Sequence, residues 1–371
     1  MQVATLGRTG LKVSRLGFGA MRVPMDGDRV DREKAIPIIH RAFEAGVNYI
    51  DTAVGYNNGD SQRAVGDALK GWRDKIVVST KNPYYGEDEK QWWQNLEESL
   101  ERLQVETIDV YNTHGARRVR LTPESKPRIE KWMNKAKDQG LIRHVCTSFH
   151  DDEEFLRYIV DSGMYGAVTL QYNMLDRKLE DGIAYAAEKN VGVVVMGPVA
   201  GGRLGAANEE LAGLVPGIER IPELALRFVL ANPNVTVALS GMGTMQQVEE
   251  NVVIASDERA FSDEELRIVR EQLHRLKEMA DAYCTGCNYC QPCPEEVNIP
   301  RIFKMYNDAR VYGFGEQARK QYARWGDEAP EGGNLADACA ECGQCIEECP
   351  QDIPIIDQLK EAHELLTDGK P

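Results

Sequence analysis

Short apolar runs recur along the first two-thirds of the chain. Each run is rich in valine, isoleucine, leucine or aromatic residues and is bounded by glycine or polar positions, which predicts a β-strand. Eight such runs occur, at residues 15–20, 47–53, 75–80, 108–114, 142–148, 167–173, 192–197 and 235–241. Because apolar residues follow one another instead of alternating with polar ones, we expect strands buried on both faces, as in a parallel sheet.

Amphipathic segments separate these strands. Residues 31–46, 89–105, 126–140 and 151–163 carry apolar side chains at helical spacing. Eight strand-helix units fit an α/β fold of the closed (β/α)8 type, a TIM barrel. A doubly wound open sheet is the alternative, but the first strand would then be followed by G-x-G-x-x-G, and "GFGAMR" at 17–22 does not supply it. The pattern therefore favours the barrel.

Further elements flank the predicted barrel. Residues 3–13 predict a hairpin around a Gly-Arg-Thr-Gly turn, placed to cover the bottom of the barrel. Residues 262–279 open with a capping box, Ser262 and Glu265, and continue as an amphipathic helix. This helix leads directly into a cysteine-rich segment. We therefore expect a barrel domain at 1–280 and a smaller, mostly helical domain at 281–371.

Charge and composition narrow the class of partner. The 371 residues include 59 acidic and 44 basic side chains, a formal net charge of −15, and such a surface repels the phosphates of nucleic acid. No apolar run is long enough to cross a membrane, and the first residues do not resemble a secretory signal. These features predict a cytoplasmic protein that acts on a small molecule, without nucleic acid or membrane as a partner.

Polar side chains follow three consecutive predicted strands. Asp51 and Tyr56 lie after the second strand, Lys81 after the third and His114 at the end of the fourth. In a parallel barrel these ends gather at one face. An ammonium stabilises a phenolate and so lowers the pKa of a tyrosine, while a carboxylate keeps that ammonium charged. The set suits proton transfer to a carbonyl oxygen that the imidazole binds.

These residues and several motifs resemble the aldo-keto reductase family. "LGRTGLKVSRLGFG", "DTAVGY", "STK", "LQYN" and "MGTMQQVEEN" occur in the family's order, and the resemblance covers most of residues 1–280. It implies NAD(P)-dependent carbonyl reduction or alcohol oxidation by hydride transfer. Tyr56 would be the general acid, Lys81 and Asp51 its tuning pair, and His114 the group that orients the substrate.

The same resemblance implies a nicotinamide site. Ser148 and Gln171 match the positions that hold the carboxamide. The positions around the pyrophosphate and adenosine are matched by Gly241, Gly243, Gln247, Glu250 and Asn251. Three departures stand out: Phe149 replaces the usual asparagine, Met196 replaces the usual stacking aromatic, and residues 240–251 lack a lysine or arginine for a 2′-phosphate. NAD is therefore as plausible a cofactor as NADP.

Eight of the nine cysteines lie in two sets after residue 283. The first set is Cys284, Cys287, Cys290 and Cys293, and the second is Cys339, Cys342, Cys345 and Cys349. A reducing compartment disfavours disulfides, and zinc usually takes paired Cys-x2-Cys knuckles. Each set has three cysteines at Cys-x2-Cys-x2-Cys spacing followed by Cys-Pro, which favours two [4Fe–4S] clusters. The ninth cysteine, Cys146, lies in a predicted strand and is expected to be a buried thiol.

The two sets resemble ferredoxin-type modules with a helical spacer. The crossed pairing of such modules would place Cys349 with the first three cysteines and Cys293 with the second three, although the gap before Cys293 is one residue short. Clusters transfer single electrons, so one alternative is an electron-transfer reductase served by a carrier and a flavin. The sequence contains no recognisable motif for FMN. Another alternative is a redox-sensing barrel with structural clusters.

Overall fold

The computed structural model describes residues 1–174, 176–199, 214–257, 259, 261–275, 284, 286–310, 315–328 and 333–368. The chain divides into two compact units. The first contains residues 1–198 and 223–262, and the second contains 199–222 and 263–371. The domain boundary expected at 280/281 lies outside the described residues.

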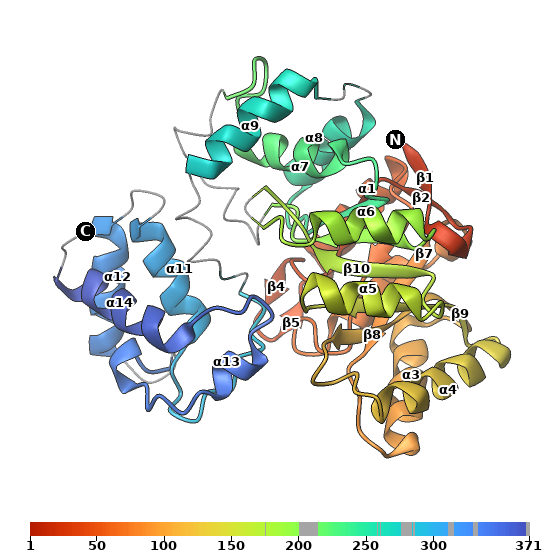
Figure 1. The fold of residues 1–371 in the computed structure, drawn as a ribbon, viewed down its shortest axis with the longest axis horizontal. Coiled ribbons are helices and arrows are strands. Elements are labelled where there is room, and N and C mark those ends of the chain that lie inside the picture. The colour runs from red at the N-terminus through yellow and green to blue at the C-terminus, as the bar shows by residue number, and fades with distance from the viewer. Residues whose placement is uncertain are drawn as a thin grey trace. The chain divides into compact units, whose positions relative to one another are not determined.

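The first unit is built on a closed barrel of eight parallel strands (Figure 1). In barrel order the strands are β3 (Leu16–Gly19), β6 (Tyr49–Asp51), β7 (Val77–Asn82), β8 (Ile108–Ala116), β9 (Ile142–Phe149), β10 (Ala167–Gln171), β11 (Gly192–Met196) and β12 (Val237–Ser240). Each strand falls on one of the eight predicted runs, and neighbours in the barrel are neighbours in the sequence. The predicted (β/α)8 fold is confirmed.

Helices follow the strands around the barrel. They are α1 (Arg32–Glu44), α2 (Ser61–Ala68), α3 (Glu89–Leu103), α4 (Ser125–Asp138), α5 (Glu153–Asp161), α6 (Glu180–Glu188), α7 (Ile221–Ala231) and α8 (Met245–Ser256). Helices α1, α3 and α5 begin at an aspartate, Asp31, Asp88 or Asp152, whose carboxylate accepts a first-turn backbone N–H. None of the described helices is long and apolar enough to cross a membrane.

The predicted hairpin closes the bottom of the barrel. Strands β1 (Val3–Thr5) and β2 (Lys12–Ser14) pair in antiparallel fashion around a short 3-10 turn. Leu6 of this hairpin is fully buried in an apolar cluster with strand residues such as Val110 and Val194. A second hairpin, β4 (Met25–Asp26) and β5 (Arg29–Val30), follows the first barrel strand and was not predicted.

The second unit is mostly helical. It contains α9 (Asp263–Arg275), α11 (Ile299–Arg310), α12 (Gly315–Glu328), α13 (Gln344–Glu348) and α14 (Ile355–Asp368). Side chains of α11, α12 and α14 form one apolar core, which includes Phe303, Tyr322 and Leu359. A parallel bridge between Val297 and Asn334 ties the end of the first cysteine motif to the start of the second. The two motifs are therefore held together by backbone pairing as well as by the core.

Candidate functional site

Four predicted catalytic residues come together at the carboxyl ends of neighbouring strands. Asp51 ends β6, Lys81 lies one residue before the end of β7, and His114 lies near the end of β8. Tyr56 lies in the loop that follows β6. Consecutive parallel strands bring these residues into contact because their ends lie at the same face of the barrel.

Lys81 and Asp51 form a buried ion pair. The Lys81 ammonium donates a hydrogen bond to the Asp51 carboxylate and another, of 2.8 Å, to the carbonyl oxygen of Thr52. Ser79 donates to the other carboxylate oxygen of Asp51 at 2.7 Å. Both charged side chains are almost completely buried. The pair is therefore satisfied on both sides, which a buried charge requires.

The Tyr56 ring lies close to both the Lys81 ammonium and the His114 imidazole. The Lys81 Nζ atom is 4.8 Å from the centre of the Tyr56 ring. The Tyr56 ring meets the His114 ring edge to face, with centres 6.1 Å apart and an interplanar angle of 81°. A cation at this distance from the ring favours a negatively charged oxygen on it.

A local irregularity of β8 positions His114. The register between β8 and β9 shifts between Thr113 and Ala116, and Gly115 adopts a positive φ of +68°. Such irregularities redirect side chains at the rims of barrels. Burial, and then the nearby Lys81 ammonium, hold the pKa of His114 well below its ordinary value. The imidazole is therefore neutral around pH 7 and can donate or accept a hydrogen bond.

Ser148 and Gln171 lie on adjacent strands, β9 and β10. Both side chains are buried, and the Gly115 N–H donates to Ser148 Oγ at 3.4 Å. The amide of Gln171 lies against Gly197, where a Cβ atom would come within 2.6 Å of the amide nitrogen. Met196, which replaces the family's usual stacking aromatic, is paired in register with Gln171. A glycine at 197 is therefore required for Gln171 to keep this position.

The predicted phosphate loop precedes α8. The Gly243 N–H donates to Gln247 Oε1 at 2.7 Å, and Thr244 caps α8 by accepting from the Gln247 N–H at 3.2 Å. A Cβ atom on Gly241 would come within 2.8 Å of the Arg22 side chain, and one on Gly243 within 2.9 Å of the Arg22 carbonyl oxygen. The two glycines therefore allow Arg22 to pack closely against the loop before α8.

The remaining predicted cofactor residues lie on α8 itself. Asn251 donates to Ser240 Oγ at 2.9 Å and so joins the helix to the end of β12. Glu250 accepts from Gln246 at 2.8 Å. Both are partly exposed. The structure thus places Gln247, Glu250 and Asn251 on α8, and the two residues predicted for the carboxamide on β9 and β10.

Several residues near the four predicted catalytic residues were not identified from the sequence. Nothing in the sequence distinguishes Ser79 from other strand residues. Its hydrogen bond to Asp51 depends on the register between β6 and β7. Gly115 follows His114, and Arg120 Nη1 lies 3.5 Å from the point where a Cβ atom on Gly115 would lie. The glycine in "THG" directly after a strand-end histidine was a signal for a positive φ, but no pattern in the sequence indicated Arg120.

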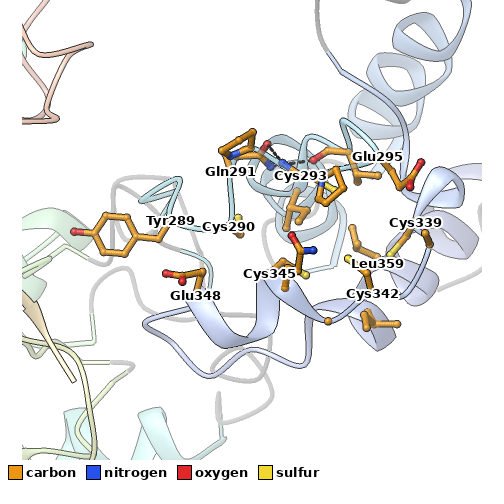
Figure 2. Close-up of a pocket in the computed structure, with 18 residues that line it drawn as sticks. Tyr289, Cys290, Gln291, Cys293, Glu295, Cys339, Cys342, Cys345, Glu348 and Leu359 are labelled. Carbon is orange, nitrogen blue, oxygen red and sulfur yellow. Dashed lines mark hydrogen bonds between the residues drawn. The ribbon is translucent and has the colours of Figure 1, made fainter. Parts of the chain in front are cut away.

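The cysteines of the second unit surround two cavities. The larger, of about 310 Å³, is shown in Figure 2 and is lined by Cys290, Cys293, Cys339, Cys342 and Cys345. The smaller, of about 20 Å³, is lined by Cys284, Cys287, Cys290 and Cys349. Each cavity therefore collects cysteines from both sequence motifs.

The cysteines that raise one another's pKa fall into the same two groups. Burial and the sulfurs of Cys284, Cys287 and Cys349 raise the pKa of Cys290 to about 12. Burial and the sulfurs of Cys339, Cys293 and Cys342 raise the pKa of Cys345 to about 11. Thiols grouped in this way ionise readily only when a cationic centre binds them.

The described part of the chain contains no three Cys, His, Asp or Glu side chains arranged to hold a single metal ion. The cysteines of the two motifs line the two cavities described above. Cys146 is separate from this arrangement. It is buried inside the barrel, where burial raises the pKa of its thiol to about 12, as expected for a core thiol.

Comparison with known proteins also separates the barrel from the cysteine-rich region. Residues 15–273 match the Aldo/keto reductase family, and residues 283–353 match the 4Fe-4S dicluster domain. The chain is 26% identical to the uncharacterized oxidoreductase YqkF of Bacillus subtilis, over 76% of this chain and 99% of the relative. It is 29% identical to the NADH-specific methylglyoxal reductase of Escherichia coli, over 75% and 100%. The holo form of aldo-keto reductase AKR11C1 from Bacillus halodurans superimposes with a TM-score of 0.63 at 29% identity, over 74% of this chain and 96% of that structure.

Proposed function

The chain belongs to the aldo/keto reductase family and is an NAD(P)-dependent oxidoreductase with a 4Fe-4S dicluster domain, and from this premise we propose a specific reaction for the barrel. It reduces a carbonyl group, or oxidises the corresponding alcohol, with Tyr56 as the general acid. The observation that carries the proposal is the position of the Lys81 ammonium, bonded to Asp51 and 4.8 Å from the Tyr56 ring.

Each of the four predicted catalytic residues has a separate role in this reaction. Tyr56 donates a proton to the carbonyl oxygen, and Lys81 stabilises the phenolate that remains. Asp51 keeps Lys81 charged and oriented. His114 is neutral and donates a hydrogen bond that orients the carbonyl oxygen toward Tyr56. The nicotinamide, when bound, supplies or accepts the hydride.

The nicotinamide nucleotide would be held by the residues that the resemblance identified. The buried Ser148 and Gln171 side chains offer hydrogen bonds for a carboxamide. The phosphate and adenosine side would be held by Gly241, Gly243, Gln247, Glu250 and Asn251. Gly243 lies directly before the amino terminus of α8, and helix amino termini favour phosphate groups.

Substitution of Tyr56 tests the reaction. Tyr56→Phe removes only the hydroxyl, and we expect NAD(P)H-dependent carbonyl reduction to fall by roughly 100-fold or more, because general acid catalysis contributes about that factor. Nucleotide binding, measured by calorimetry, should be unchanged. Tyr185→Phe is the matched control, since Tyr185 lies on α6 and bonds to Asp161 at the surface. A Tyr56→Phe enzyme with full activity would disprove the mechanism.

We also propose that the second unit binds two [4Fe–4S] clusters with crossed ligands. The first would use Cys284, Cys287, Cys290 and Cys349, and the second would use Cys339, Cys342, Cys345 and Cys293. The cysteine lining of the two cavities supports this division, although Cys290 borders both. Protein purified without oxygen should contain about eight iron and eight sulfide per chain. A colourless protein with zinc would contradict the proposal.

Two features bear on what the clusters do. Cys342 is exposed, which supports exchange of single electrons with a separate carrier. Cys349 belongs to the apolar core of the second unit, and five other proposed ligand cysteines pack against this core. The clusters would therefore also stabilise the fold of the unit. We propose electron exchange as the main role. Reduction of the clusters by NAD(P)H or by a carrier, followed by visible absorption, would support it, and clusters that no donor reduces would contradict it.

A further inference from the structure

The loop that carries Tyr56 is bonded to the β4–β5 hairpin by the residues that follow the tyrosine. The Nδ2 atom of Asn57 donates to the Sδ atom of Met25 at 3.0 Å. The Nδ2 atom of Asn58 donates to the carbonyl oxygen of Asp28 at 3.3 Å. Both asparagines have a positive φ, of +53° and +55°, which asparagine adopts more readily than most residues. The backbone of the loop is therefore shaped so that these side chains reach the hairpin.

An ion pair of Asp60 adds to these bonds. The Asp60 carboxylate accepts from the Val30 N–H at 2.9 Å, from Arg32 Nη2 at 2.8 Å and from Arg32 Nη1. Asp60 directly precedes α2, where an aspartate usually caps the helix, but its side chain forms no cap bond. The carboxylate instead bonds to the end of β5 and to the first residue of α1. A carboxylate held by both arms of a guanidinium is fixed in orientation as well as in position.

Backbone hydrogen bonds connect Asp60 to Tyr56 through a tight turn. The N–H groups of Gly59 and Ser61 donate to the carbonyl oxygen of Tyr56 at 3.1 and 3.2 Å. The Asp60 N–H donates to the carbonyl oxygen of Asn57 at 3.0 Å. Because these bonds close the turn between Tyr56 and Asp60, a displacement of Asp60 also displaces the backbone of Tyr56.

The hairpin has little apolar core of its own. Strands β4 and β5 have two residues each, and of these four only Val30 is buried. An isolated two-stranded hairpin is at best marginally stable in water. The bonds from Asp60, Asn57 and Asn58 therefore order the hairpin and the Tyr56 loop together.

We infer that Asp60 is a positioning residue, which acts with the β4–β5 hairpin to hold the loop that carries the Tyr56 phenol. This inference rests on the proposed role of Tyr56 as the general acid. The Tyr56 ring lies 4.8 Å from the Lys81 ammonium and meets the His114 ring edge to face, so its place is defined relative to both. Proton transfer requires the phenol within hydrogen-bond distance of the carbonyl oxygen. A displacement of about 1 Å, even one caused far from the reacting atoms, can cost a factor of about 100 in rate.

Asp67 provides a matched control on the same helix. Its carboxylate also pairs with Arg32, at 3.5 Å. Its other partners, Lys70 at 2.9 Å and Gln104 at 3.1 Å, lie outside the Tyr56 loop. Replacement of Asp67 therefore removes an equal charge and another bond to Arg32 without releasing the loop.

Reduction of 4-nitrobenzaldehyde by NADH or NADPH tests the inference. Asp60→Ala should lower kcat by roughly ten- to hundredfold, because the Tyr56 loop loses its fixed position. Asp60→Asn keeps an oxygen for the Val30 N–H but loses the charge that pairs with Arg32, so its kcat should fall less. Asp67→Ala should stay within about twofold of wild type. Nucleotide binding, measured by calorimetry, should be unchanged in all three variants, whereas a loss of folded protein would lower nucleotide binding and activity together.

The Tyr56→Phe background shows whether Asp60 acts through Tyr56. Asp60→Ala should cause no further loss of kcat there, and an undiminished loss would show that Asp60 acts by another route. Full activity of Asp60→Ala beside an inactive Tyr56→Phe enzyme would overturn the inference alone. Full activity of Tyr56→Phe would overturn the proposed reaction and, with it, the inference.

Amide hydrogen exchange of residues 54–60 gives a second readout that needs no turnover. Exchange in this segment should be faster in Asp60→Ala and unchanged in Asp67→Ala. Equal exchange in Asp60→Ala and wild type would show that Asp60 does not hold the loop, and would contradict the inference whatever the activity.

Discussion

Lys81 joins Asp51 to Tyr56. Its ammonium donates a hydrogen bond to the Asp51 carboxylate and lies 4.8 Å from the centre of the Tyr56 ring. Both members of the ion pair are almost fully buried, so each depends on the other for compensation. The pair therefore links stability to the proposed proton transfer.

The buried pair should show strong coupling in stability. Removing one partner leaves an uncompensated buried charge, so Asp51→Asn and Lys81→Met should each lower the free energy of unfolding by about 3–5 kcal/mol. The double variant should be destabilised by much less than the sum, because neither charge remains. Urea denaturation of the four proteins measures this coupling. Additive losses would mean that the pair does not act as a unit, and carbonyl reduction should be lost in all three variants.

The positive φ of Gly115 should matter for activity as well as stability. Gly115→Ala places a Cβ atom in a left-handed conformation and 3.5 Å from Arg120, and should cost about 1–2 kcal/mol of stability. Gly140→Ala is the matched control, because Gly140 also has a positive φ, of +74°, but faces open space. Both variants should lose stability in thermal melts. Only Gly115→Ala should lower kcat/KM, and equal kinetic effects would argue against a role for the β8 irregularity.

His150 should make the barrel less stable in acid. Its pKa is about 3 in the folded chain and near 6.5 in the unfolded chain. As the pH falls from about 6.5 toward 3, the unfolded chain takes up a proton that the folded chain does not, so stability decreases. His150→Asn should reduce this pH slope by about 1 kcal/mol per pH unit. Denaturation of wild type and variant between pH 4.5 and 7 gives the difference, and identical slopes would contradict the assignment.

Pairs of cysteine substitutions should reveal which ligands share a cluster. If Cys349 serves the same cluster as Cys284, the double variant Cys284→Ala/Cys349→Ala loses one cluster and keeps about four iron atoms. Cys339→Ala/Cys349→Ala should then lose both clusters. Iron analysis of protein purified without oxygen distinguishes the two variants. The reverse result, with more iron in Cys339→Ala/Cys349→Ala, would mean that each motif binds its own cluster.

The order of elements could be predicted from the sequence because it depends on local chemistry. Continuous apolar runs separated by amphipathic segments indicated a parallel barrel, and all eight predicted strands are present. Asp51, Lys81 and His114 could be identified because parallel strands bring their carboxyl ends together. The cysteine spacing likewise indicated an iron–sulfur domain before any contact was known. These inferences need only the periodicity of strands and helices and the spacing of ligands.

Contacts between distant segments required the tertiary structure. The hydrogen bond from Ser79 to Asp51 depends on the register between β6 and β7. The approach of Arg120 and His150 to Gly115 depends on the irregular pairing of β8 with β9. The sequence suggested crossed cysteine sets only by resemblance, whereas the fold brings Cys349 beside a cavity lined by Cys284. Such contacts join residues far apart in the chain, and only the packing of whole elements determines which of them meet.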